Sequence, residues 1–159
     1  MIRQTEKKDA KRPAKQEGQS WLSTSLSVKD VELAAKLYEN VFGFGEAKIA
    51  KSKAGKALYG TLKYKDVSIM LSCEGTDEWS LSSPATSKQK CPTFFYLYTE
   101  DLEGCFEKAK NAKMEILQPI KEEFWGDKVF MTKDPNGYVW IVATNVGEFD
   151  PTKAPKEWQ

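Results

Sequence analysis

The feature that most constrains the fold of this chain is an internal repeat with an offset of 71 residues. The segment VKDVELAAKLYENV (28–41) aligns with the segment TEDLEGCFEKAKNA (99–112), so that Asp30 falls on Asp101. Both segments place apolar residues at the i, i+3, i+4, i+7 spacing of an amphipathic helix, and both aspartates suit a helix N-cap. A duplicated unit of this size predicts a fold built from two similar halves.

The repeat extends to strands on both sides of each helix. Segments 21–28 and 92–99 precede the helices, and extended segments at about 46–51 and 114–118 follow them. Each half ends in a hairpin, and the second hairpin contains Asp-Pro-Asn-Gly, which is typical of a tight turn. Each half is therefore predicted to be a βαβββ unit, and the expected fold class is α+β.

Length and charge favour one domain between two polar tails. A chain of 159 residues is long enough to hold a single core. We expect the domain to span 21–147, with repeat one at 21–73 and repeat two at 92–147. Residues 1–20 carry six basic and three acidic side chains, which predicts a basic polar arm, and 148–159 are expected to form a polar C-terminal tail.

The absence of histidine excludes more chemistry than any other property of the composition. The chain has 24 Lys and Arg, 23 Asp and Glu, three cysteines and no histidine. A Ser-His-Asp triad, a histidine general base and a His-ligated metal are therefore impossible.

A net charge of +1 gives no field that attracts nucleic acid, and no apolar run is long enough to span a bilayer. The cysteine spacing fits a reducing compartment, so we expect a cytoplasmic protein with no nucleic-acid or membrane partner.

Strand alternation assigns side chains to two faces, because successive residues point to opposite sides of a sheet. The first strand places Leu22 and Leu26 toward the helix and its serines on the opposite face. In the second half, that opposite face carries Phe94, Tyr96 and Tyr98. Three aromatic rings on a face without a helix would be an unusual apolar patch, so this face predicts a ligand pocket or a dimer interface. An ordinary solvated face is the alternative.

These motifs resemble the vicinal oxygen chelate superfamily, which includes glyoxalase I, extradiol dioxygenases, and the bleomycin and fosfomycin resistance proteins. The resemblance covers about 21–147 and rests on LSVKDVELAAKLYENVFGF, VSIMLS, YTEDLEGCFEKAKNAKMEILQP and FWGDKVFMTKDPNGYVWIVAT, in that order. It implies two βαβββ repeats that form a U-shaped mixed sheet around a cavity, the glyoxalase/bleomycin resistance fold. Members are commonly homodimers, so a homodimer is expected here.

Metal-using members of this superfamily place four ligands on the first and last strands of each unit. By motif, those positions fall on Ser23, Met70, Phe94 and Ile141. A hydroxyl, a thioether and two hydrocarbon side chains make a poor site for a transition metal. The resemblance therefore indicates the metal-free, bleomycin-resistance-like branch, with no cofactor and no metal ligand.

The stretch PIKEEFWGDKVFMTKDPNG resembles those metal-free binders, which have a Trp-Gly pair shortly before an Asp-Pro-x-Gly turn. On that analogy Phe124 and Trp125 lie in a loop at the cavity mouth, where aromatic rings stack on a planar ligand. The alternative is that Trp125 packs on its own hairpin or at a dimer interface. The near-neutral charge argues against bleomycin itself, because a cationic drug favours an acidic partner.

The predicted function is metal-independent binding of a small molecule, such as sequestration of a drug or metabolite. One alternative is a metal-independent lyase or isomerase in which Tyr or Glu supplies acid–base chemistry. Another is a dimeric interaction module without a ligand. No catalytic residue is assigned. The predicted ligand-binding residues are Ser23, Ser25, Met70, Phe94, Tyr96, Tyr98, Phe124, Trp125 and Ile141.

Overall fold

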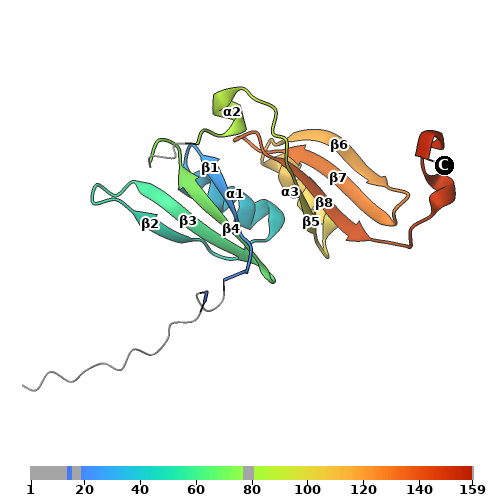
Figure 1. Cartoon of the computed structure of the whole chain (residues 1–159), viewed down its shortest axis with the longest axis horizontal. Coiled ribbons are helices and arrows are strands. Elements are labelled where there is room, and N and C mark those ends of the chain that lie inside the picture. The colour runs from blue at the N-terminus through green and yellow to red at the C-terminus, as the bar shows by residue number, and fades with distance from the viewer. Residues whose placement is uncertain (1–13, 16–18, 77–80, 159) are drawn as a thin grey trace, which may run out of the picture.

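The computed structural model describes residues 14–15, 19–76 and 81–158, and these form two βαβββ halves (Figure 1). The first half consists of β1 (Thr24–Val28), α1 (Val31–Phe42), β2 (Lys48–Lys51), β3 (Ala57–Tyr64) and β4 (Val67–Cys73). The second half consists of β5 (Phe94–Tyr98), α3 (Leu102–Asn111), β6 (Glu115–Glu122), β7 (Asp127–Lys133) and β8 (Val139–Asn145). The short helix α2 (Pro84–Ser87) lies between the halves, and η1 (Pro151–Lys153) and η2 (Lys156–Trp158) follow them. Most of the predicted N-terminal arm, 1–13 and 16–18, lies outside the described residues.

The strands form two four-stranded mixed sheets with equivalent strand orders. The orders are β1-β4-β3-β2 and β5-β8-β7-β6. In each sheet the first strand of the half pairs in parallel with its last strand, and the remaining pairs are antiparallel. Figure 1 shows the sheets side by side, with α1 and α3 behind the strands. The α+β class and the two βαβββ repeats are therefore confirmed, and among the described residues no strand pairs across the two sheets.

Both long helices begin at the predicted aspartates. The Asp30 carboxylate accepts a hydrogen bond from the Leu33 amide, and the Asp101 carboxylate accepts one from the Gly104 amide, each at 2.9 Å. Each bond satisfies an amide that the first helical turn leaves without a backbone partner. Helix α1 ends at Gly43, whose φ of 77° glycine adopts without strain. Within the described residues, no helix has the length and apolar character that crossing a membrane requires.

One hydrophobic core joins the two halves. The apolar stripe of α1 is buried, and α1 packs against α3 as well as against its own sheet. From β8 of the second half, the Trp140 ring stacks on Phe42 of α1, with centroids 4.5 Å apart, and lies 5.0 Å from Tyr38. Because these rings are almost fully buried, the halves form one folding unit rather than two independent repeats.

The first strand begins later than the sequence predicts. Strand β1 starts at Thr24, so Leu22 and Ser23 precede it, and Leu22 is 87% exposed instead of packed under the helix. Extending the parallel register of Thr24 with Ile69 would place Leu22 beside Val67, which is itself 45% exposed. The helix does not cover this end of the sheet, so the predicted packing of Leu22 is wrong.

Candidate functional site

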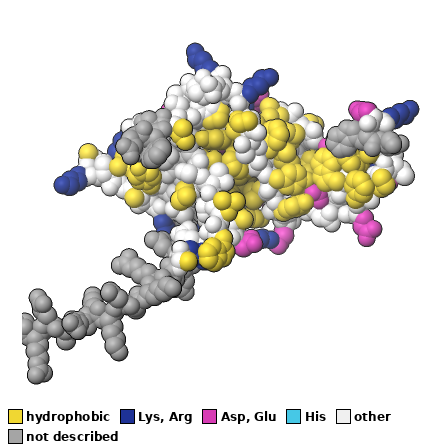
Figure 2. All heavy atoms as spheres, viewed as in Figure 1, with side chains coloured by type: hydrophobic (Ala, Val, Ile, Leu, Met, Phe, Trp, Pro, Cys, Tyr) yellow, Lys and Arg dark blue, Asp and Glu magenta, His cyan; other side chains and the backbone are white. Residues whose placement is uncertain are grey.

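Each sheet has one face against the helices and one face that the helices leave open. On the first sheet the open face carries the serines of β1 and β4 and Met70, and β3 adds Tyr59 and Lys63 beside Ser72 and Ser68. On the second sheet it carries Phe94, Tyr96 and Tyr98, which are 58%, 42% and 54% exposed. Figure 2 shows hydrophobic side chains gathered over the second sheet, in the right half of the view. The predicted difference between the two open faces is therefore present in the structure.

A buried carboxylate holds the two tyrosines of the second open face. Asp127, the first residue of β7, is 2% exposed. Its Oδ2 accepts hydrogen bonds from the hydroxyls of Tyr96 and Tyr98, both at 2.7 Å, and its Oδ1 accepts one from the Asn145 amide at 3.1 Å. The two tyrosine rings lie 5.3 Å apart between centroids. These bonds fix the orientation of two rings that face solvent.

Trp125 extends the same network. Its indole Nε1 donates a hydrogen bond to the Tyr96 hydroxyl oxygen at 3.0 Å, while that hydroxyl donates to Asp127. Between Trp125 and Asp127 the chain turns at Gly126, with φ of 93°, and a Cβ there would collide with the Gly147 carbonyl. Only glycine therefore fits this position of the Trp-Gly pair. We call Tyr96, Tyr98, Trp125 and Asp127 the aromatic cluster.

Phe124 lies beside the aromatic cluster and packs against the C-terminal segment. Its ring centroid is 5.1 Å from that of Trp125 and 5.9 Å from that of Phe149, and its carbonyl accepts a hydrogen bond from the Asp150 amide at 2.8 Å. Phe124, Trp125 and Lys153 contribute to the lining of a cavity of about 580 Å³. Phe124 and Trp125 are the two predicted ligand-binding residues that line this cavity, and the indole of Trp125 contacts Tyr96 of β5, outside its own hairpin.

The hydrogen bonds of the aromatic cluster decide the protonation of its members. Burial raises the pKa of Asp127, but the hydrogen bonds from Tyr96, Tyr98 and Asn145 outweigh burial and hold that pKa below its usual value. Burial, together with the hydrogen bond to Asp127, raises the pKa of Tyr96. The hydrogen bond to Asp127 and burial raise the pKa of Tyr98 as well. At neutral pH both phenols therefore stay protonated, with their protons directed at Asp127.

The four positions that correspond to metal ligands do not fit a metal ion. The Ser23 hydroxyl forms a 2.7 Å hydrogen bond with the Ser68 hydroxyl, and the thioether of Met70 is a weak ligand for the metals in question. Phe94 and Ile141 have no donor atom. Two of the positions belong to the first half and two to the second sheet. Among the described residues, no group of three or more His, Cys, Asp or Glu side chains could hold a metal ion.

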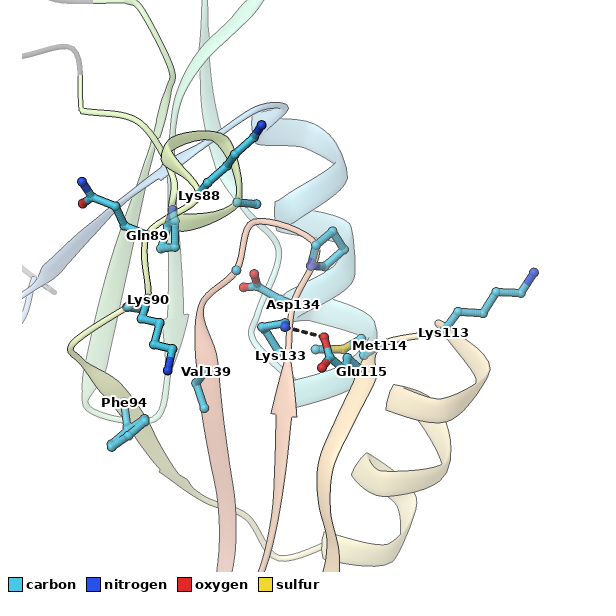
Figure 3. A pocket seen from close by; sticks show the side chains of 15 residues that line it. Lys88, Gln89, Lys90, Phe94, Lys113, Met114, Glu115, Lys133, Asp134 and Val139 are labelled. Atoms are coloured by element: carbon cyan, nitrogen blue, oxygen red, sulfur yellow. Dashed lines mark ion pairs between the residues drawn. The ribbon is translucent and has the colours of Figure 1, made fainter.

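A second cavity, of about 760 Å³, lies at the opposite end of the second open face (Figure 3). Phe94 and Val139, which are neighbours in the register of β5 and β8, contribute to one wall. The segment that joins the two halves, including residues 88–91, contributes to another wall. Of the predicted ligand-binding residues, only Phe94 lines this cavity.

The structure brings together only part of the predicted site. Tyr96, Tyr98 and Trp125 contact one another through the Asp127 network, and Ile141 lies beside Tyr96 in the strand register. The predicted residues of the first half, Ser23, Ser25 and Met70, belong to the other open face.

Sequence reasoning missed two aspartates. Strand alternation could have found Asp127, because β7 places it on the same face as the tyrosines. Asp134 had no such signal: its Oδ2 accepts a 2.6 Å hydrogen bond from Tyr38, 96 positions away, and a 3.1 Å hydrogen bond from the Trp140 indole. It lies in the Asp-Pro-Asn-Gly turn, is 3% exposed, and connects the second hairpin to α1 of the first half.

Comparisons with known proteins agree with this architecture. The family model for the Glyoxalase/Bleomycin resistance protein/Dioxygenase superfamily matches residues 21–142. An uncharacterized protein of Mycobacterium bovis is 26% identical over 133 residues, which is 80% of this chain and 84% of that protein. The crystal structure of TioX from Micromonospora sp. ML1 matches with a TM-score of 0.60 at 18% identity, over 79% of this chain and 98% of TioX. A glyoxalase/bleomycin resistance protein/dioxygenase family enzyme from Burkholderia phytofirmans PsJN gives a TM-score of 0.60 at 13% identity, over 78% of this chain and 97% of that one. The chain therefore belongs to the glyoxalase/bleomycin resistance protein/dioxygenase superfamily.

Proposed function

We propose that this protein binds a planar small molecule against its aromatic cluster. Membership of the superfamily supports a small-molecule binding or resistance-type protein. The observation that carries the proposal is the convergence of the Tyr96 and Tyr98 hydroxyls on the buried Asp127 carboxylate. Tyrosine and tryptophan rings present large stacking surfaces, and rings that are already fixed lose little side-chain freedom on binding. Sequestration of a drug or a metabolite is the role that suits such a surface.

Binding is proposed to be independent of metal. The ligand positions of metal-using relatives carry Ser23, Met70, Phe94 and Ile141 here, and none of these side chains offers an anionic oxygen or an imidazole. The affinity for the small molecule must then come from stacking, burial and hydrogen bonds. A chelator should leave it unchanged.

The protonation of the cluster favours binding over acid–base catalysis. A tyrosine acts as a base only as a phenolate, and hydrogen bonds to Asp127 favour the phenol form of both Tyr96 and Tyr98. A carboxylate whose pKa lies below its usual value is a weak general base at neutral pH. These directions argue against proton abstraction by Tyr96, Tyr98 or Asp127, and so favour a binder over a lyase or isomerase that uses one of them as its base.

A second candidate function is a dimeric interaction module, which the exposure of the same rings favours. Phe94 and Tyr98 are each more than half exposed, and β5 forms an edge of its sheet. A second copy of the chain could cover this face and complete a cavity over it. We propose a homodimer on this ground, and light scattering of the purified protein measures it directly.

The test combines a ligand screen with matched variants. Thermal unfolding in the presence of planar aromatic compounds should identify stabilising ligands, and a ligand at 100 times its Kd adds about 2.7 kcal/mol. Trp125→Ala and Tyr98→Ser should abolish most of this stabilisation. Tyr59→Ser is the control, because it removes a half-exposed tyrosine from the first sheet.

Three results would contradict the proposal. The first is ligand stabilisation that Tyr59→Ser reduces as strongly as Tyr98→Ser. The second is a stoichiometric divalent metal whose removal by a chelator abolishes binding. The third is a dimer that occludes the cluster completely and leaves no ligand effect, which would support the interaction module.

A further inference from the structure

The cavity of about 760 Å³ has a chemistry different from that of the aromatic cluster. Its volume falls within the range of about 300–1,000 Å³ that is usual for small-molecule sites. Four lysines, Lys88, Lys90, Lys113 and Lys133, line it, and Glu115 and Asp134 are the only carboxylates among its described lining residues.

Neither carboxylate is open to a cationic ligand. Glu115 forms an ion pair with Lys133 (dashed in Figure 3), so these two charges compensate each other. Asp134 is 3% exposed, and its oxygens accept hydrogen bonds from Tyr38, Trp140 and two backbone amides. The remaining charge of the cavity is therefore positive.

Lys90 is the lysine best placed to meet a ligand. Figure 3 shows its side chain directed toward the part of the cavity where Phe94 and Val139 lie, whereas Lys88 and Lys113 extend outward at the rim. None of these three lysines forms an ion pair within the described part of the chain. Lys88 ends α2 with a φ of 57°, and residues 88–90 follow one another along the cavity. The Lys90 ammonium group is therefore directed toward the apolar wall that Phe94 and Val139 form.

We propose that this cavity binds an aromatic carboxylate, with the ring against Phe94 and Val139 and the carboxylate at Lys90. A single inward cation matches a single negative charge, and a charge-assisted hydrogen bond is stronger than a neutral one. A cavity of this size, with an apolar wall, suits an organic anion better than an inorganic ion. The assignment does not depend on ligand binding at the aromatic cluster, which lies at the other end of the sheet.

The test uses naphthoate and its neutral amide, naphthamide, as a matched pair of probes for calorimetric titration of the full chain. Naphthoate should bind at least about tenfold more tightly than naphthamide, the ratio expected of one hydrogen bond to a charged group. Lys90→Gln should weaken naphthoate binding by about the same factor and leave naphthamide binding unchanged. Raising the salt concentration should weaken naphthoate binding to the wild type, because the lysine is exposed.

Two control variants keep the test specific. Lys36→Gln removes one positive charge from an exposed position of α1 outside the cavity, so it should leave naphthoate binding unchanged. Tyr98→Ser removes any naphthoate bound at the aromatic cluster, so in the Tyr98→Ser background Lys90→Gln should still weaken naphthoate binding by about tenfold, which separates this site from the proposed function. The proposal is overturned if naphthoate does not bind, if it binds no better than naphthamide, if Lys36→Gln weakens binding as much as Lys90→Gln, or if Lys90→Gln has no effect in the wild type or in the Tyr98→Ser background. Circular dichroism of each variant confirms that it is folded.

Discussion

The two halves of this protein share one topology but present different open faces. At the offset of 71 residues, Ser25 of the first half corresponds to Tyr96 of the second, and Ser27 corresponds to Tyr98. The strand orders and the parallel pairing of first and last strands are equivalent in both. Backbone pairing and helix burial therefore preserve the fold, while alternate strand positions on the open face are free to change their chemistry.

The halves also differ in how they use carboxylates. In the second half Asp127 organises the exposed aromatic rings, and Asp134 reaches across to Tyr38 of the first half. One carboxylate therefore supports the candidate site, and the other joins the repeats. Substitutions that separate these two roles test the comparison directly.

The largest effect is expected from Asp134→Ala. The substitution leaves the Tyr38 hydroxyl, the Trp140 indole and two backbone amides without their acceptor in a buried place. We expect a loss of about 3 to 5 kcal/mol in the free energy of unfolding, since each buried unsatisfied group costs about 1 to 3 kcal/mol and the structure relaxes in part. Urea denaturation measures the loss. Glu107→Gln, which removes an exposed ion pair with Lys110, should change stability by less than about 0.5 kcal/mol.

A smaller effect is expected from Asp127→Asn. The carboxylate accepts hydrogen bonds on both oxygens, whereas an amide offers one acceptor and one donor, so either the tyrosines or Asn145 must lose a bond. The expected loss is about 1 to 3 kcal/mol in the free energy of unfolding, together with most of the ligand stabilisation at the aromatic cluster. Ser25→Ala on the first open face should have little effect on either quantity. Equal effects of the two substitutions would show that the open faces are not functionally different.

The helix caps should behave alike in the two halves. Asp30→Ala and Asp101→Ala each remove one side-chain acceptor for a first-turn amide. Each substitution should lower the free energy of unfolding by about 1 kcal/mol, and the double variant by about the sum because the sites are separate. A difference of more than about 1 kcal/mol between the single variants would mean that the two N-caps do not contribute equally to the stability of the repeats.

The smallest effect is a pH dependence. The pKa of Asp127 is lower in the folded chain than in the unfolded one, so the unfolded chain binds more protons in the acid range and stability falls with falling pH there. The contribution of Asp127 to the free energy of unfolding is complete above its unfolded pKa of about 3.9. It is lost as the pH falls through the lower pKa of the folded chain. Urea denaturation below about pH 4 should show a shallower loss in Asp127→Asn than in the wild type. Parallel curves for the two proteins would contradict the assigned direction.

The sequence predicted the elements better than the site. The helical stripes, the two N-cap aspartates and the hairpin turn depend on nearby residues, so local patterns were sufficient to find them. Leu22 was misplaced because alternation does not show where a helix stops covering a sheet. Local patterns do not show whether Trp125 stacks on a ligand or packs against the protein, because its contact with Tyr96 spans 29 positions.

The duplication, the α+β class, the lack of histidine chemistry and the side chains that alternate onto each open face all follow from the order of residues along this chain. Three features became visible only in the folded chain: Asp127 accepts hydrogen bonds from both tyrosines, Asp134 connects the halves, and Lys90 is directed toward an apolar wall. These features join residues that are far apart along the chain. Periodicity reports the neighbours of a residue within one element, whereas a buried carboxylate or a cavity is made by elements that meet only when the chain is packed.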